Sequence, residues 1–338
     1  MDSYINFFLI NTLLITCINY VQHKLNFLID LKLKHKIKYK EKIALSGGIY
    51  ILISVILCKI IYNIDINSNL IFVLVLFFVL GYFSDTRPNF IPALRLMIQL
   101  ALIFLLIYLC KIEINQTNIF FIDKFMSIKE FNIIFTSACI IVLLNGSNFI
   151  DGVNTNLIGY YIIVLLFISG FNFYIDINYL LITFIVFYIY NFLGKCFLGD
   201  NGVYVISILI SFIVISIINY NSLNPIIAIN LLWYPAFENL FSIIRRYVSN
   251  NKVDIADKRH LHSILYLILN KKKSLSKYAN SLSGFLICLY NLIAIGLSYK
   301  YLYNNQILLS ILIINITVYL FIYFKLLNIL SNRDVSKK

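Results

Sequence analysis

Apolar stretches separated by short polar segments make up nearly the whole chain, and their lengths determine which elements we expect. A helix needs about 20 apolar residues to cross a bilayer. The sequence therefore predicts an all-α, polytopic membrane protein with about eleven membrane-spanning helices, and ten as the alternative count. The predicted spans lie near residues 4–21, 43–62, 69–83, 92–110, 131–147, 157–173, 178–193, 203–219, 226–244, 281–302 and 306–330.

The basic residues predict how these spans are oriented. One basic run, from Lys24 to Lys42, follows the first span, and a second extends from Arg245 to Lys277. Lys and Arg gather on the cytoplasmic side of membrane proteins, so we expect the N-terminus outside and the C-terminus in the cytoplasm. The cytoplasmic loops would then lie near residues 23–42, 84–91, 148–156, 194–202 and 245–280.

Composition agrees with this interpretation. Of the 338 residues, 61% are hydrophobic, compared with about 45–50% in soluble domains. No repeat or linker divides the chain, so residues 1–338 form one predicted domain in the inner (cytoplasmic) membrane. The net charge of +13 does not indicate nucleic-acid binding, because the basic runs lie in short loops between spans. The six cysteines are scattered without a metal-ligand spacing, which indicates packing roles.

Four polar clusters interrupt the apolar spans, and all four open on the cytoplasmic face of the expected topology. The most informative places Asp200 between Gly199 and Gly202, preceded by Asn191 and Lys195. A carboxylate at membrane depth costs a few kcal/mol unless it faces a wet cavity or a cation. Magnesium prefers one or two carboxylates together with substrate phosphate oxygens. Asp200 is therefore a candidate magnesium ligand, and a structural turn is the alternative.

Two further clusters carry carboxylates. Asp85 ends the third predicted span, where it would ligate a metal, orient a nucleophile or cap a helix end. Asn145, Asn148 and Asp151 recur every three residues, so they share one face if the helix extends that far. Such groups suit hydrogen bonding to a base, a ribose or a sugar, and polar contacts between helices are the alternative.

The fourth cluster contains two of the chain's four histidines. His260 and His262 follow Arg259, and the pair Arg245-Arg246 lies upstream at the expected inner interface. A zinc site needs three or four ligands, and the sequence offers no third histidine or cysteine nearby. A clamp for phosphate or sugar is therefore favoured.

The order of these motifs resembles a known family, the polyprenyl-phosphate N-acetylhexosamine-1-phosphate transferases of glycosyltransferase family 4. The late segment looks most like the branch that initiates O-antigen and enterobacterial common antigen. The resemblance spans roughly residues 44 to 265 and is carried by Gly47-Gly48, Gly81 to Asp85, Asn145-x-x-Asn148-x-x-Asp151-Gly152, Phe197-x-Gly199-Asp200-x-Gly202 and Arg245-Arg246 with Asp257, His260 and His262.

The resemblance implies a reaction and roles for the residues. Sugar-1-phosphate from a UDP-N-acetylhexosamine such as UDP-GlcNAc would pass to polyprenyl (undecaprenyl) phosphate, releasing UMP. This would be the first membrane step in the synthesis of an O-antigen-like surface polysaccharide. The oligomeric state is left open, with a homodimer as one possibility. Asp85, Asp151 and Asp200 would be catalytic, with Asp200 and Asp85 holding magnesium (manganese as the alternative). The substrate-binding set would be Asn145, Asn148, Asn154, Asn191, Lys195, Arg259, His260 and His262.

The sequence departs from the family pattern in two places. The family's adjacent aspartates are reduced to one, with Ser84 or Thr86 as the replacement depending on the direction of counting. Asn154 stands where the family often has a second aspartate. These changes keep open a catalytically silent relative that acts as a binding protein. A transporter is a further alternative, but transporters usually show repeated halves, which this chain lacks.

Overall fold

Helices make up nearly all of the part of the chain that the computed structural model describes. The helices of the first half are α1 Asp2–Leu25, α2 Gly47–Tyr62, α3 Ser68–Thr86, α4 Pro92–Cys110, α5 Phe120–Met126, α6 Lys129–Ile150 and α7 Asn156–Ile168. Those of the second half are α8 Ile177–Phe192, α9 Gly199–Tyr220, α10 Ile226–Leu231, α11 Trp233–Val248, α12 Leu261–Asn270, α13 Ala279–Lys300 and α14 Asn305–Val335. The described residues are 2–30, 42–87, 89–248, 259–272 and 274–335, with side chains to residue 330.

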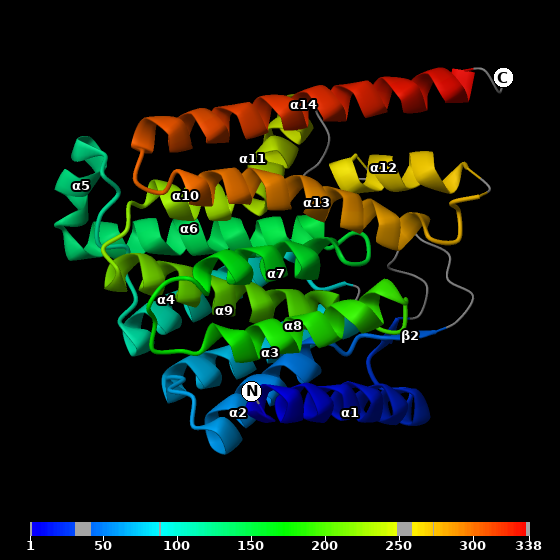
Figure 1. Ribbon diagram of the computed structural model, residues 1–338, viewed down its shortest axis with the longest axis horizontal. Coiled ribbons are helices and arrows are strands. Elements are labelled where there is room, and N and C mark those ends of the chain that lie inside the picture. The colour runs from blue at the N-terminus through cyan, green and yellow to red at the C-terminus, as the bar shows by residue number, and fades with distance from the viewer. Residues whose placement is uncertain (1, 31–41, 88, 249–258, 273, 336–338) are drawn as a thin grey trace.

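A short ribbon marks one end of the helical bundle. Strands β1 (Ile29–Asp30) and β2 (Ile43–Ala44) pair antiparallel, and Ala44 forms an isolated parallel bridge with Cys196. Figure 1 shows this ribbon, α12 and the C-terminus at one end of the bundle, and α5 at the other. We call these the ribbon end and the α5 end. The loops predicted to be cytoplasmic lie at the ribbon end as far as they are described.

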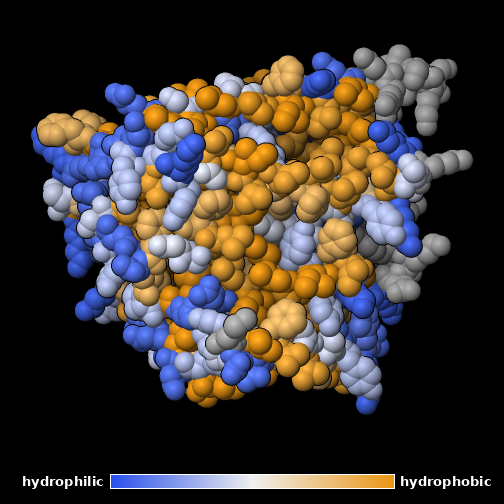
Figure 2. Space-filling model, in the orientation of Figure 1, coloured by the Kyte–Doolittle hydropathy of each residue, from blue (hydrophilic) through white to orange (hydrophobic). Residues whose placement is uncertain are grey.

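The bundle has the apolar surface of a membrane-embedded protein. Within the described residues, seven helices are long and apolar enough to cross a membrane, and four further apolar helices are shorter. Figure 2 shows a broad hydrophobic face across the middle of the bundle, with hydrophilic side chains gathered toward its ends. Ten predicted spans each match one helix, which confirms the all-α, polytopic class. These helices are α1, α2, α3, α4, α6, α7, α8, α9, α13 and α14.

The most enclosed helix is α9, which packs against α2, α3 and α6. Its first turn passes so close to α3 that a Cβ atom on Gly81 would lie 2.3 Å from the Cα of Asn201. Only glycine permits such an approach of two backbones. The small residue at position 81 therefore brings the end of α3 against the beginning of α9.

The structure differs in one respect from the sequence prediction for the second half and adds a helix in another. The span predicted over 226–244 is two helices, α10 and α11, because Pro235 has no N–H to donate to the carbonyl of Leu231, and a proline ring also crowds that carbonyl. The predicted loop 245–280 contains α12, whose buried Leu261, Ile264 and Ile268 recur at helical spacing. This face packs against α13 and α14.

Candidate functional site

Three carboxylates lie at the ribbon end. Asp85 lies in the last turn of α3, Asp151 directly follows α6, and Asp200 lies in the first turn of α9. Burial raises the pKa of Asp151 well above its usual range, and the negative charges of Asp200 and Asp85 raise it further. Their charges thus influence one another although they come from separate helices, and we call these three carboxylates the acidic group.

Asp85 binds the N-terminus of α9. One of its oxygens accepts a hydrogen bond from the backbone N–H of Asp200 at 3.0 Å, and the other accepts from the backbone N–H of Asn201 at 3.0 Å. The side-chain amide of Asn201 adds a third bond at 2.6 Å. The first N–H groups of a helix have no partner within the helix and carry partial positive charge. Asp85 thus caps a helix, but that helix is α9 and not its own.

Asp200 is partly accessible. Its side chain is 25% exposed, and its Oδ2 atom lies 3.9 Å from the guanidinium of Arg95. The same oxygen accepts a hydrogen bond from the hydroxyl of Ser84. The hydroxyl of Thr86 instead donates to the carbonyl of Tyr82 in its own helix. Of the two candidates for the missing aspartate, Ser84 is therefore the one that lies at the site.

The oxygens of Asp200 fit a magnesium ion better than those of Asp85, which already accept three hydrogen bonds. Among the described residues, no three His, Cys, Asp or Glu side chains gather closely enough to hold a metal ion by themselves. Magnesium is commonly bound by one or two carboxylates plus substrate phosphates. The residues present fit an ion of that kind, and the pairing of Asp200 with Asp85 as ligands stays a prediction.

A column of stacked side chains holds the two histidines. The rings of His260 and His262 are stacked, 5.5 Å between centroids and 3° from parallel. Phe149 stacks on His260 at 5.4 Å, and the guanidinium of Arg246 lies 5.4 Å from the centre of the Phe149 ring. Both histidine side chains are buried. The histidines are thus fixed groups within the fold and are not mobile surface residues.

Gly152 joins the histidine column to the acidic group. A Cβ atom on this residue would lie 1.9 Å from Nε2 of His262, so only a hydrogen fits between the backbone and the imidazole. Gly152 directly follows Asp151. The structure therefore brings His262 beside the segment that carries one of the three carboxylates, and a shared role for the two in one site stays a prediction.

The four predicted asparagines have different surroundings. Asn145 donates to the carbonyl of Ile141 in its own helix, and Asn148 is partly exposed near the end of α6. Asn154 donates to the carbonyl of Asn191 at 2.8 Å, and Asn191 accepts from the N–H of Thr155 at 2.6 Å. Both of these side chains are buried. Asn154 and Asn191 therefore hold the 151–155 loop against the end of α8, and their substrate contacts stay a prediction.

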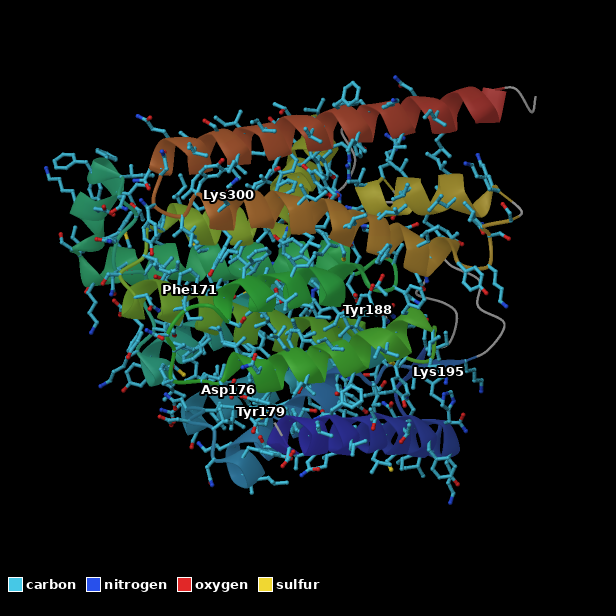
Figure 3. All side chains as sticks on the ribbon, viewed as in Figure 1. Phe171, Asp176, Tyr179, Tyr188, Lys195 and Lys300 are labelled. Atoms are coloured by element: carbon cyan, nitrogen blue, oxygen red, sulfur yellow. The ribbon has the colours of Figure 1, made fainter. Side chains whose placement is uncertain are left out.

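The two predicted cations lie at the surface. Lys195 is exposed at the ribbon end (Figure 3), with its ammonium 5.8 Å from the centre of the Tyr190 ring. Arg259 is also exposed and immediately precedes the histidines. Neither position contradicts a role in attracting an anionic substrate. Asp257 lies outside the described residues.

Two residues to which the prediction gave no role complete the site. Asn201 is buried. Its side-chain NH₂ donates to Asp85, and its side-chain oxygen accepts from the backbone N–H of Gly48 at 2.9 Å. Glu238 is buried and accepts from the ring of His260 and the hydroxyl of Tyr319. The periodicity of α11 contained a signal for Glu238, because Glu238, Ser242 and Arg246 recur every four residues and are all buried.

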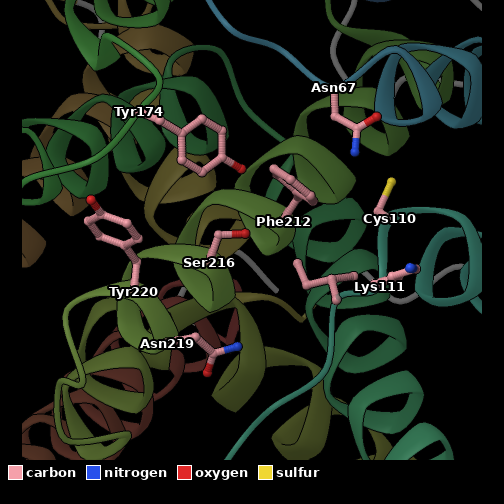
Figure 4. A pocket seen from close by; sticks show the side chains of 9 residues that line it. Asn67, Cys110, Lys111, Tyr174, Phe212, Ser216, Asn219 and Tyr220 are labelled. Atoms are coloured by element: carbon pink, nitrogen blue, oxygen red, sulfur yellow. The ribbon is translucent and has the colours of Figure 1, made fainter.

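A separate cavity of about 360 Å³ lies at the α5 end (Figure 4). Its lining includes residues of α9 from Phe212 to Tyr220, so at 1.5 Å per residue it lies about 18 to 30 Å along the helix from Asp200. The cavity is therefore distinct from the acidic group. Its lining residues are Asn67, Cys110, Lys111, Ile112, Tyr174, Phe212, Ser216, Asn219 and Tyr220.

Comparison with known proteins gives a family match. Residues 67–218 match the model of the family described as glycosyl transferase family 4. None of the curated proteins matches the chain. The family consists of phospho-sugar transferases that use a nucleotide-sugar donor and a polyprenyl phosphate acceptor. The matching stretch contains Asp85, Asp151 and Asp200, and the match supports the resemblance of the chain to glycosyl transferase family 4.

Proposed function

We propose that this protein transfers N-acetylhexosamine-1-phosphate from a UDP-sugar to undecaprenyl phosphate, producing polyprenyl-diphospho-sugar and UMP. One observation carries the proposal. Asp200, a partly exposed carboxylate in the first turn of α9, lies beside Arg95 at the end of a membrane-embedded bundle and within the stretch that matches the family. An anionic donor and a lipid acceptor can meet at such a place.

The reaction requires two charged substrates to approach one another. An oxygen of the lipid phosphate attacks the β-phosphorus of the UDP-sugar, and the bond from that phosphorus to the bridging oxygen breaks. UMP leaves with this oxygen and the bond electrons. Phosphoryl transfer of this kind depends mainly on positioning and on neutralising negative charge. The site therefore has to bring cationic groups to an acidic cluster.

The residues suit that task in distinct ways. Asp200, assisted by Asp85, would hold a magnesium ion, which when bound supplies Lewis-acid stabilisation of the diphosphate. Arg95, 3.9 Å from Asp200, would contact a phosphate oxygen. Asp85 fixes the position of Asp200 by anchoring the first turn of α9. Asn148 and Asp151 would contact the nucleotide-sugar.

The surroundings favour a lipid acceptor and a cytoplasmic donor. The hydrophobic face of the bundle (Figure 2) would solvate the polyprenyl tail in the bilayer. Basic residues near the ribbon end that the structure describes, such as Lys42 and Lys195, would attract the UDP-sugar and lipid head groups. We therefore propose that the site faces the cytoplasm from the inner membrane and begins an O-antigen-like polysaccharide.

A mass spectrum of the lipid product tests this proposal. Purified protein in detergent would receive undecaprenyl phosphate, magnesium and each of several UDP-N-acetylhexosamines in turn. We expect one sugar, with N-acetylglucosamine first in line, to yield a lipid heavier by one sugar phosphate. If folded and monodisperse protein gave no product with any sugar, the result would favour a catalytically silent relative, inactive because Ser84 replaces an aspartate.

A further inference from the structure

Glu238 lies in the interior of the bundle and bonds one of the two histidines. One oxygen of the carboxylate lies 2.9 Å from Nδ1 of His260, and the other accepts a hydrogen bond from the hydroxyl of Tyr319. Glu238 is fully buried and His260 is nearly so. A carboxylate at this depth is costly unless other groups pair with it or donate hydrogen bonds to it. His260 and Tyr319 are those partners here.

From this geometry we propose that Glu238 is a positioning residue that sets the orientation and tautomer of His260 for the transfer reaction. This inference rests on the proposed function, because it assumes that His260 faces the diphosphate or the sugar. A neutral imidazole carries its proton on one of two nitrogens, and a hydrogen bond at one nitrogen selects the tautomer. A carboxylate that accepts from Nδ1–H leaves Nε2 as the nitrogen for a substrate.

The stacking in the column supports the same conclusion. The His260 ring is held between Phe149 on one side and His262 on the other. Stacking fixes the plane of the ring but leaves its rotation within the plane free. The bond to Glu238 removes that freedom. Together these contacts leave the imidazole of His260 with one orientation.

Tyr319 gives the C-terminal helix a part in the site. It belongs to α14, is fully buried and packs edge-on against Phe237 of α11, with ring centroids 5.0 Å apart. Its hydroxyl occupies the second oxygen of Glu238, so the carboxylate cannot turn away from His260 without losing this bond. Glu238, His260 and Tyr319 all lie outside residues 67–218, the stretch that matches the family.

A double-mutant cycle in the UMP-release assay tests the proposal. We expect Glu238→Gln to lower kcat about 10- to 100-fold, as loss of an outer-shell partner of a functional histidine commonly does, with little change in KM. Combined with His260→Gln, it should cost no more than His260→Gln alone, because the two residues act as one unit. Additive losses would overturn the proposal.

Two control variants separate positioning from packing. Asn239→Ala alters the neighbouring buried residue, which bonds the carbonyl of Val142 in α6, and should lower thermal stability while leaving kcat nearly unchanged. Tyr319→Phe removes the bond to the second oxygen of Glu238 but leaves the bond to His260, so it should lower kcat by less than Glu238→Gln does. If Asn239→Ala lowered kcat as much as Glu238→Gln, the loss would reflect the packing of α11, and the proposal would be wrong.

A spectroscopic measurement does not depend on activity. The chain has four histidines, so protein with ¹⁵N-labelled imidazoles in nanodiscs should give few ring signals. We expect a downfield proton on Nδ1 that vanishes in His260→Gln and moves upfield in Glu238→Gln. Absence of that proton, or no shift in Glu238→Gln, would refute the positioning role. Wild-type protein without UMP release would refute the proposed function instead, and these spectra would still decide the role of Glu238.

Discussion

Asn201 donates two hydrogen bonds to the same carboxylate oxygen of Asp85, from its backbone N–H at 3.0 Å and from its side-chain amide at 2.6 Å. The two residues belong to α9 and α3, which are far apart in the chain. Their contact makes the end of one helix the cap of another. Asp200 lies in the capped turn, so its position depends on Asp85.

Asp85→Asn should therefore lower both stability and activity. The amide keeps one accepting oxygen but brings an NH₂ group against the N–H donors of α9. Hydrogen bonds to a charged group contribute about 1.5–3 kcal/mol each, so we expect a lower thermal midpoint and a large loss of UMP release. The matched control is Asp123→Asn at the α5 end, where the carboxylate accepts from the N–H of Thr117 at 2.6 Å. Equal activity losses in both variants would contradict this account of Asp85.

Ser84→Asp should raise the affinity for magnesium. The hydroxyl of Ser84 already contacts Asp200, so a carboxylate there would add a second acidic ligand beside it. We expect the magnesium concentration for half-maximal UMP release to fall several-fold. Thr86→Asp is the control, because Thr86 is exposed and bonds its own helix. The prediction fails if the two variants behave alike.

Gly152→Ala should impair the reaction, because the new methyl group would lie 1.9 Å from Nε2 of His262. Either the imidazole or the segment after Asp151 has to move, and misplacement of a reacting group by about 1 Å can cost 10²-fold in rate. Gly296→Ala provides a control, since its nearest neighbour would be 3.5 Å away on Phe167. Both variants would be assayed for UMP release and thermal midpoint. Full activity in Gly152→Ala would show that this contact is dispensable.

Ionisation of Asp151 should lower the free energy of unfolding as pH rises. An unfolded aspartate has a pKa of about 4, whereas burial and the charges of Asp200 and Asp85 raise the pKa of Asp151 well above that in the folded state. Between the two values the folded state binds more protons, so the free energy of unfolding falls with increasing pH. The asparagine in Asp151→Asn cannot ionise. As pH rises above about 4, the thermal midpoint of this variant should therefore fall less than that of wild type.

The comparison variant for this pH series is Asp123→Asn. The hydrogen bond from Thr117 lowers the pKa of Asp123, so its contribution to stability is lost only as pH falls below about 4. Above that pH, Asp123→Asn should follow the wild-type curve. If the thermal midpoints of wild type and Asp151→Asn changed in parallel with pH, this result would contradict the raised pKa of Asp151.

Much of the fold could be predicted from apolar run length alone, because each membrane helix needs its own apolar residues. The beginning of α9 could not. The prediction placed residues 194–202 in a loop, whereas the helix begins at Gly199. Asp85, which caps that turn, lies on another helix, so no local pattern could indicate the helix start.

The site was predictable where one segment carries the chemistry and less so where side chains from distant segments meet. Asp200 and the two histidines were found because carboxylates and imidazoles are rare in apolar spans. Glu238 was passed over, since its partners His260 and Tyr319 lie 22 and 81 positions away. The geometry also distinguishes Ser84 from Thr86, which counting along the chain left undecided.

UMP release by wild type and by Asp200→Asn tests the central claim most directly. The substitution keeps the shape of the side chain and one oxygen near Ser84 and Arg95, but it removes the charge that would hold magnesium. We predict UMP release that requires undecaprenyl phosphate, magnesium and a UDP-N-acetylhexosamine, and that falls at least about 100-fold in Asp200→Asn while the protein stays folded. UMP release that Asp200→Asn leaves unchanged would contradict the account, because the transfer would then take place without the carboxylate on which the proposed site depends.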